Sequence, residues 1–257
     1  MLSGEEAVER VQGLKTKYER IGYLEKRFDE IEKALFTATG YVDAINILAE
    51  LDSRRNAVET ELAQIRQTRY EELWSILKVP APLNVRWLSD VRDSADRALV
   101  EEGVRLFASL TNHPSLEGRS VRIVKSPPIG ERSDYLYGHS LIRLGATADA
   151  LTVAHELGHW LEDIDKSVLQ KSLVFLRRRT VREPLERLRD LMENQSYGEA
   201  EMAWKDKFLS PYVGKDYRGR ASEVVSMGVQ YLCEFPEVFA QGDPEHFAFV
   251  YDVLRGR

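Results

Sequence analysis

Two histidines and a glutamate are spaced along the chain as a zinc site requires. His155, Glu156 and His159 belong to the segment His-Glu-Leu-Gly-His. Because residues four apart lie on the same face of a helix, His155 and His159 can offer two imidazoles to one ion. Zinc accepts neutral imidazole nitrogens in tetrahedral sites. We therefore predict that one helix supplies two ligands to a bound Zn²⁺.

Glu156 directly follows the first predicted ligand and is expected close to the ion without binding it. From there its carboxylate can take a proton from zinc-activated water and later pass it to a leaving group. The chain has only five histidines, so the bare pattern is expected by chance on the order of 0.01 times in such a chain. The alternative is a surface pair of histidines on an ordinary helix. The pattern favours zinc-dependent hydrolysis, with Glu156 as the catalytic base.

The elements around these residues must place them on a helix that follows a strand. Arg119–Lys125 is predicted as one strand, and Tyr135–Leu144 alternates as a second. Thr147 or Asp149 can cap the helix that follows. Gly158 leaves room for the close approach of a neighbouring backbone. The apolar stripe that would hold this helix consists of Leu151, Ala154, Leu157 and Leu161.

Residues 119–165 resemble the core of the zincin metallopeptidase superfamily. In that superfamily an edge strand precedes the His-Glu-x-x-His helix and binds the peptide substrate. The resemblance implies that Asp134–Leu144 is this strand and that its free backbone groups pair with an extended peptide. The tract from Phe208 to Phe247 is more loosely similar to zincin-like proteins of bacteria and their phages. That similarity suggests a mobile-element or defence context and names no substrate.

The third zinc ligand is expected later in the chain. A metzincin pattern would need glycine and histidine where the chain has Glu162 and Asp165. A gluzincin-like arrangement uses a glutamate on a later helix, and Glu223 begins a mostly apolar segment where an unpartnered acid is costly. The alternative is a helix N-terminal acid favoured by the helix dipole. Many gluzincin-like families place a carboxylate one turn after this glutamate, whereas this chain has Ser226 and Met227, of which Ser226 could orient a ligand.

Other polar residues have weaker claims to the site. Asp163 lies one turn beyond His159, too far along the helix to complete a tetrahedron, and is expected beside a ligand or at the surface. His139 is expected on a strand face. His246 is expected at the surface of the last helix, with an oxyanion donor as the alternative. For the oxyanion itself we predict Tyr217, and the competing candidates are Tyr212 and Arg220.

Residues 1–79 are predicted to form an antiparallel helical hairpin that resembles a coiled coil. Apolar residues recur every seven positions in its first arm, at Leu14, Ile21, Phe28 and Leu35. Thr37–Gly40 breaks the pattern. The second arm has its own apolar stripe, formed by Ile45, Leu48, Leu51, Val58, Leu62, Ile65 and Leu73 and interrupted by Arg55 and Arg69. The hairpin either braces the rest of the chain or docks a protein partner, and both interpretations stay open.

The prolines of Val79–Pro82 mark the domain boundary, because proline cannot continue a helix. Residues 83–257 are predicted to form a zincin-like domain. Its further predicted elements are a helix at Ser89–Leu110, a turn at Pro127–Gly130, a helical segment at Ser167–Met192 broken at Pro184, a loop at Ser210–Gly219, a helix from Ser222 through Leu232, and a last helix capped by Asp243 and ending at Leu254.

Composition limits the possible partners. The net charge is −6 and the pI is near 5.6, which disfavours nucleic acid and anionic lipid. Arg177–Arg179 with Arg182 is interpreted as a solvated helix face rather than a phosphate site. Cys233 is the only cysteine and is expected in the core. The absence of a disulfide pair, a secretory signal or an apolar span leads us to expect a cytoplasmic protein.

These expectations combine into an α+β protein, mostly α, with a helical hairpin followed by a zincin-like domain that has a small sheet. The expected activity is zinc-dependent hydrolysis of peptide bonds with narrow specificity. The expected partner is a protein or peptide substrate, docked by the hairpin. A catalytically silent zincin-fold protein, such as a phage or assembly component, is the alternative, and a toxin-like effector that cleaves one host protein is a third possibility. The oligomeric state stays open.

Overall fold

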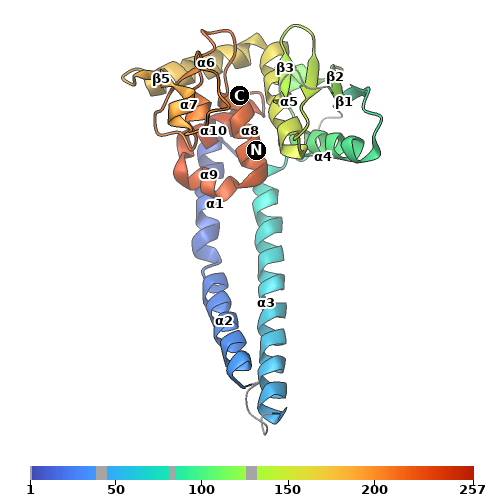
Figure 1. Ribbon diagram of the computed structural model, residues 1–257, viewed down its shortest axis with the longest axis vertical. Helices are drawn as coiled ribbons and strands as arrows, with labels where there is room; N and C mark the ends of the chain where they lie inside the picture. Colours follow the sequence, from blue (N-terminus) through green and yellow to red (C-terminus); the bar gives the residue numbers. More distant parts are fainter. Residues whose placement is uncertain (1, 39–44, 82–84, 126–131) are drawn as a thin grey trace. The chain divides into compact units, whose positions relative to one another are not determined.

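The computed structural model describes residues 2–38, 45–81, 85–125 and 132–257 (Figure 1). The chain is mostly helical, with a small mixed sheet, as predicted for an α+β protein. It divides into two compact units: Glu9–Ile76 forms one, and the residues up to Val8 join Leu77–Arg257 in the other. Among the described helices, none combines the length and the apolar character needed to cross a membrane.

The unit Glu9–Ile76 contains a pair of antiparallel helices, α2 (Arg20–Ala38) and α3 (Ile45–Leu77). Buried Ile21, Leu24 and Ile31 pack with Val58 and Leu62 of α3, so the predicted apolar seam is present. Ion pairs such as Arg66–Glu25, at 2.6 Å, flank it. The predicted first arm is not continuous, because α1 (Gly4–Lys17) ends before α2 begins. Part of the predicted turn, at Thr39 and Gly40, lies outside the described residues.

A four-stranded sheet lies in the other unit. Its order is β1 (Arg86–Ser89), β2 (Ser120–Lys125), β4 (Leu141–Leu144) and β3 (Asp134–Leu136). The first three strands run parallel, and β3 pairs antiparallel to β4 at the edge. The prediction of one strand over Tyr135–Leu144 was wrong: a tight turn at 137–140 divides it, with Gly138 at φ 77° and Ser140 at φ 45°. The edge strand is therefore β3 alone.

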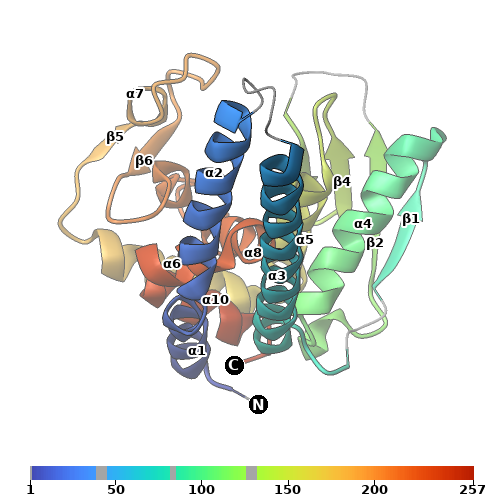
Figure 2. The same cartoon turned by 90° about the horizontal axis from the view of Figure 1, so that it is seen from below.

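Helix α4 (Ser94–Leu110) was predicted to begin too early. Ser89 ends strand β1, and Asp93 caps the helix by accepting hydrogen bonds from the backbone N–H groups of Ala95 and Asp96. The predicted turn at Pro127–Gly130 lies outside the described residues. Helices α4 and α5 (Ala150–Ile164) pack against each other, and both lie beside the sheet in the two views (Figures 1 and 2).

Helix α5 carries the His-Glu-Leu-Gly-His motif. Of the two predicted caps, Asp149 is the one observed: its side chain accepts from Thr152 N at 2.7 Å, and the Thr152 hydroxyl completes a capping box. The helix packs against α4 and against α8 (Val224–Glu234). A Cβ on Gly158 would lie only 2.7 Å from the Cα of Ser226. Glycine is therefore required there, and this close approach sets how near α8 comes to the motif.

The C-terminal third departs most from the sequence prediction. The helical segment predicted over Ser167–Met192 with a break at Pro184 corresponds to α6 (Lys166–Thr180), which ends before that proline. Strand β5 (Leu185–Arg187) pairs antiparallel with β6 (Met202–Trp204), and the short helix α7 (Leu188–Leu191) follows β5. The 3-10 turn η2 (Pro211–Gly214) and the helices α9 (Pro236–Gly242) and α10 (Pro244–Val253) complete this third. A similar turn, η1 (Pro114–Leu116), lies earlier in the chain, after α4. Asp243 caps α10 as predicted, by accepting from His246 N at 3.1 Å, and the helix ends one residue before Leu254.

The prediction that Arg177–Arg179 and Arg182 form a solvated face was wrong for one of these residues, Arg179. The Arg179 side chain is 11% exposed and donates to Asp206 at 2.8 Å and to Asp243 at 2.9 Å. Arg177, Arg178 and Arg182 are exposed. Cys233 is half-buried, and burial raises the pKa of its thiol to about 12. A thiol that stays protonated is a poor nucleophile.

Candidate metal centre

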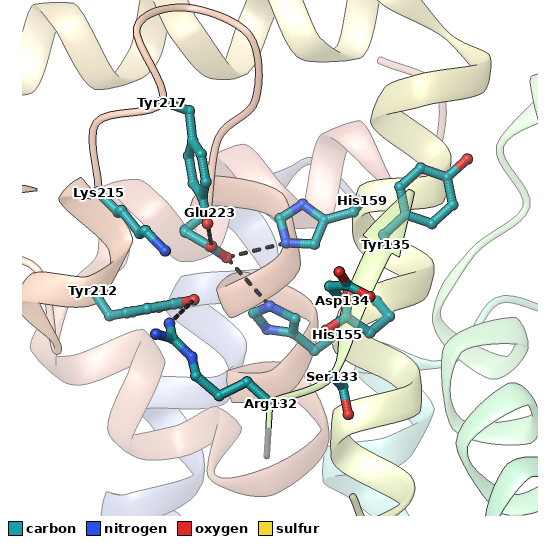
Figure 3. A pocket seen from close by; sticks show the side chains of 11 residues that line it. Arg132, Ser133, Asp134, Tyr135, His155, His159, Tyr212, Lys215, Tyr217 and Glu223 are labelled. Carbon is teal, nitrogen blue, oxygen red and sulfur yellow. Dashed lines mark hydrogen bonds and ion pairs between the residues drawn. The ribbon is translucent and has the colours of Figure 1, made fainter. Parts of the chain in front are cut away.

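Two side chains of helix α5 and one from the residue before helix α8 converge at one point (Figure 3). His155 and His159 project from α5, with ring centroids 5.1 Å apart. Glu223 immediately precedes α8, and its Oε2 lies 3.2 Å from the Nε2 of each histidine. The Glu223 side chain is 1% exposed and does not cap α8. Its carboxylate therefore faces the two imidazoles instead of the N–H groups of its own helix.

The separations between these atoms suit a small divalent cation. The three candidate ligand atoms all lie within 4.8 Å of one another. In a tetrahedral zinc site with bonds of about 2.0–2.1 Å, the ligand atoms are roughly 3.4 Å apart. Two neutral nitrogens and one carboxylate oxygen are ligand types that zinc accepts. The residues present thus fit a zinc ion in both chemistry and spacing.

The far side of the His159 ring is held by a buried hydrogen-bond network. The Tyr137 hydroxyl lies 3.0 Å from His159 Nδ1 and donates to Glu162 at 3.4 Å. The Ser222 hydroxyl donates to the same carboxylate at 3.0 Å. Because Tyr137 gives its proton to Glu162, its oxygen can accept from an Nδ1–H group. That tautomer leaves the Nε2 lone pair of His159 directed at the site, as a metal ligand requires.

The electrostatics of the cluster call for positive charge between the histidines and Glu223. Burial alone would raise the pKa of Glu223, but His159 and His155 outweigh it and hold the pKa well below the usual 4.5. Burial alone would lower the pKa of His159, but Glu223 and Glu162 outweigh it and raise the pKa well above 6.5. A carboxylate facing two imidazole nitrogens needs a cation between them, either protons or a metal ion.

Two hydroxyls fix the Glu223 carboxylate. Tyr217 donates to Oε1 at 2.5 Å, and Ser226 donates to Oε2 at 2.8 Å. Burial is the main cause that raises the pKa of Tyr217, followed by the Glu223 charge, so the phenol stays protonated. The structure therefore brings Tyr217 to the site with its proton directed at Glu223, and it brings Ser226 into contact with Glu223.

Glu156 is buried beside the cluster and is 5% exposed. Its Oε2 has no hydrogen-bond partner among the described residues, and neither does Nδ1 of His155. Burial raises the pKa of Glu156, and the neighbouring histidines oppose that shift. A buried carboxyl oxygen without a partner is expensive to keep, so Oε2 of Glu156 has the capacity to accept a proton from a bound molecule.

The cluster opens into a cavity of about 430 Å³. Strand β3 contributes Asp134 and Tyr135 to its lining, and Arg132 and Ser133 come from the residues before this strand. The other lining residues are His155, Glu156, His159, Tyr212, Lys215, Tyr217 and Glu223. The edge strand that the zincin resemblance implied thus borders the candidate site, although it is shorter than expected.

Asp163 ties the edge strand to the motif helix. Its Oδ2 accepts from the Tyr135 hydroxyl at 2.8 Å and from Gly138 N at 2.6 Å, and Oδ1 accepts from Lys166 at 2.5 Å. Its pKa is lowered: burial opposes this shift, and the hydrogen bonds from Lys166 and Gly138 outweigh burial. Asp163 is therefore a half-buried anchor for the turn at 137–140.

Three residues considered from sequence do not join the cavity. His139 lies in the turn at 137–140 and is exposed, and Arg220 is exposed as well. His246 is fully buried among Phe175, Phe208 and other rings, so neither the surface prediction nor the oxyanion alternative holds. Its Nε2 lies 2.7 Å from the carbonyl oxygen of Val224. His246 thereby links α10 to the first turn of α8, next to Glu223.

Sequence reasoning missed several residues that surround the site. Glu162 lies three positions after His159 on the same helix, so helical spacing could have suggested its contact with that histidine. Tyr137, Arg132 and Lys215 have no such local signal, because each reaches the site through a turn or a loop whose path depends on distant contacts. The cap-like position of Ser222 before α8 gave no hint of its bond to Glu162.

A scan against protein-family models found no match, and searches of curated proteins and of solved structures found no similar protein. What the site can do is therefore inferred from its own atoms. The cluster of two imidazoles and one carboxylate can hold a divalent cation, and Glu156 can move a proton at the edge of the same cavity. The edge strand β3 offers backbone groups beside both.

Proposed function

We propose that this chain is a zinc-dependent peptidase of the zincin type, with His155, His159 and Glu223 as the zinc ligands. The observation that carries the proposal is the convergence of two histidine Nε2 atoms and one Glu223 oxygen on a cavity that Glu156 also lines. When bound, zinc acts as a Lewis acid that polarises a peptide carbonyl and makes water easier to deprotonate. The remaining steps belong to the side chains.

Glu156 is the proposed general base and then general acid. Its carboxylate takes a proton from the attacking water, and it later gives that proton to the nitrogen of the leaving amine. The free Oε2 of Glu156 supports this role, because no described residue competes for it. A catalytically silent protein would have no need for a buried, unpartnered carboxyl group at this position, which favours the enzyme over the structural alternative.

Strand β3 and Tyr217 complete the proposed mechanism. An extended substrate can pair with the outer edge of β3, which binds β4 on its other side. In this structure Tyr217 orients Glu223 by donating a hydrogen bond to its carboxylate. A change in its side-chain torsion would let the same hydroxyl donate to the negatively charged oxygen that develops during attack, as an oxyanion donor does.

Metal analysis tests the ligand set. The purified protein is expected to contain about one zinc per chain, and Glu223→Ala is expected to lose most of it, because a site with three protein ligands then keeps two. The matched control is Glu234→Ala, which removes an exposed glutamate at the other end of α8 and is expected to keep the metal. Atomic emission measures the zinc content of the two variants. Equal zinc content in both variants removes Glu223 from the ligand set.

Mapping of new protein N-termini tests the reaction. A cell proteome treated with the wild-type protein is expected to gain specific N-termini, and Glu156→Gln is expected to lower their rate of formation about 10²- to 10⁴-fold while keeping zinc. Glutamine preserves the shape of the side chain but cannot accept the proton. Equal cleavage by both proteins places the activity elsewhere. A zinc-loaded wild type that yields no new N-termini supports the silent alternative.

A further inference from the structure

One wall of the cavity is cationic. Arg132 and Lys215 both line the cavity. Arg132 comes just before Ser133 and strand β3, and Lys215 directly follows turn η2. Figure 3 shows both side chains with Tyr212 on one side of the cavity and the two histidines on the other. The zinc chemistry proposed above uses none of these three residues. Their presence beside the reacting groups therefore needs its own explanation.

Both cations have partners within the protein, and the Arg132 side chain is 45% exposed. Glu201 accepts from Arg132 Nη1 at 3.0 Å and lies 2.7 Å from Lys215 Nζ, yet it does not line the cavity. The Arg132 guanidinium stacks 4.7 Å from the centre of the Tyr197 ring, and Lys215 Nζ lies 4.7 Å from that of Tyr217. Glu201 thus pairs with both cations, and among the described residues it is the only carboxylate that forms an ion pair with either of them.

Arg132 and Lys215 keep donors for a ligand. Among the described residues, Arg132 donates to Glu201 and Tyr212, and Lys215 pairs with Glu201. A guanidinium carries five N–H donors and an ammonium carries three, so both have donors to spare. A planar guanidinium fork matches the two oxygens of a carboxylate, and hydrogen bonds between such charged groups are the strong ones. The Lys215 side chain is only 11% exposed, which weakens competition from water.

We propose that Arg132 and Lys215 bind a carboxylate of the substrate beside the bond that is cut, so that this wall selects acidic substrates. The inference rests on the proposed peptidase function for its reaction. The carboxylate belongs either to an acidic side chain near the scissile bond or to the free C-terminus of the substrate. Arg132 and Lys215 act as specificity-determining residues and leave proton transfer to Glu156.

Peptide binding to the full chain with Glu156→Gln, as purified, tests the proposal without turnover. One series of short fluorescent peptides has an amidated C-terminus and a single Glu moved through each position. The second series has Gln in place of Glu, and the third has Gln with a free C-terminal carboxylate. Fluorescence anisotropy is expected to show at least one Glu peptide or the free-carboxylate peptides binding about tenfold tighter than the matched neutral peptides.

Arg132→Gln in the same background is expected to abolish this preference, whereas Arg132→Lys keeps the charge and is expected to keep part of it. The matched control is Arg122→Gln, which removes an exposed arginine of β2 that pairs with Asp90 and does not line the cavity. This control is expected to bind like the parent. Thermal unfolding of each variant shows whether a loss of binding reflects a loss of folding. If Arg132→Lys keeps the preference for carboxylates, replacement of Arg132 does not in itself unfold the protein.

The outcomes separate this inference from the proposed function. Equal binding of charged and neutral peptides, or a preference that survives Arg132→Gln, overturns the proposal that Arg132 and Lys215 bind a substrate carboxylate. This holds even if Glu156-dependent cleavage is found. A carboxylate preference that depends on Arg132, in a protein without zinc or cleavage, supports carboxylate binding by this wall and overturns the proposed peptidase function. Preference for the first series identifies an acidic side chain as the ligand, and preference for the third identifies the C-terminal carboxylate.

Discussion

Helices α2 and α3 pack differently from helices α5 and α8. The α2–α3 seam consists of apolar residues such as Leu24 and Leu62, with ion pairs along exposed flanks. The α5–α8 contact depends on a glycine, Gly158, and encloses the buried polar groups His159 and Glu223. The first arrangement spreads its stability over many exchangeable apolar contacts. The second concentrates it in a few groups that must all be satisfied.

This contrast predicts where substitutions will change stability most. A polar residue on the α2–α3 flank is solvated in both the folded and the unfolded chain, so its loss changes the free energy of unfolding little. A polar residue buried near α8 has left water, and its charge state or geometry is tied to folding. Three predictions test this contrast. The stability of the protein is expected to change more on substitution beside α5 and α8 than on substitution in the α2–α3 hairpin.

The largest effect is expected from His246, whose Nε2 contacts the first turn of α8. Burial lowers the pKa of His246 to about 4, against 6.5 for an ordinary histidine. The unfolded chain therefore takes up a proton at a higher pH than the folded chain does. Stability from this group is complete above about pH 6.5 and is lost as the pH falls toward about 4, a total of about 3 kcal/mol.

Urea unfolding at about pH 7 and about pH 4 measures this loss. His246→Gln keeps an N–H donor for the Val224 carbonyl but cannot titrate in this range, so it is expected to lose less stability between the two pH values than the wild type. Asp243, Arg179 and the other charged groups near His246 are the same in both proteins and cancel in the comparison. Equal losses in the two proteins would show that His246 does not titrate on unfolding.

A smaller effect is expected from adding one methyl group at a glycine of each region. Gly158→Ala would press a Cβ against the Ser226 backbone, so we expect a loss of about 2 kcal/mol. Zinc binding is also expected to weaken, because Glu223 immediately precedes α8. Gly22→Ala in α2 meets nothing within 4 Å and is expected to gain about 0.5–1 kcal/mol from helix propensity. Urea unfolding and zinc content are the measurements. A Gly158→Ala protein as stable as the wild type would contradict the close approach.

The smallest effect is expected at the surface of the hairpin. Glu72 accepts from Lys17 at 2.7 Å and from the Tyr18 hydroxyl at 2.7 Å, and these bonds lower its pKa against a small opposing effect of burial. Because the pair is exposed to water and salt, Glu72→Gln is expected to cost less than about 1 kcal/mol. Hydrogen exchange of α3 amides measures the change. A loss of several kcal/mol would mean that the hairpin depends on this pair.

The sequence was informative where short-range spacing carries the structure. Helical spacing predicted that His155 and His159 share a face, and the apolar setting of Glu223 suggested a partner for its charge. Periodicity likewise identified the α2–α3 seam, and Asp243 marked the start of α10. Each of these inferences uses residues within one or two helical turns of one another.

Contacts between distant segments could not be predicted in this way. The strand β1 is only four residues long, and such a short segment has little periodicity. It was not predicted, and its last residue, Ser89, was taken for the start of the following helix. The pairing of β5 with β6, and the network of Tyr137 with Glu162 and Ser222, join residues whose proximity depends on the whole fold. Arg132 and Lys215 enter the cavity from loops, where no pattern of apolar residues shows which way a side chain points.

The anchoring of the turn at 137–140 by Asp163 has a consequence for recognition. Since Tyr135 and Gly138 both donate to this carboxylate, two hydrogen bonds tie β3 and its turn to helix α5 before any peptide arrives. A peptide that adds to this edge would lose its own backbone freedom, but the protein side would lose little. Affinity along β3 would then depend chiefly on how readily the incoming chain adopts an extended form, which favours unstructured stretches of a target over its folded parts.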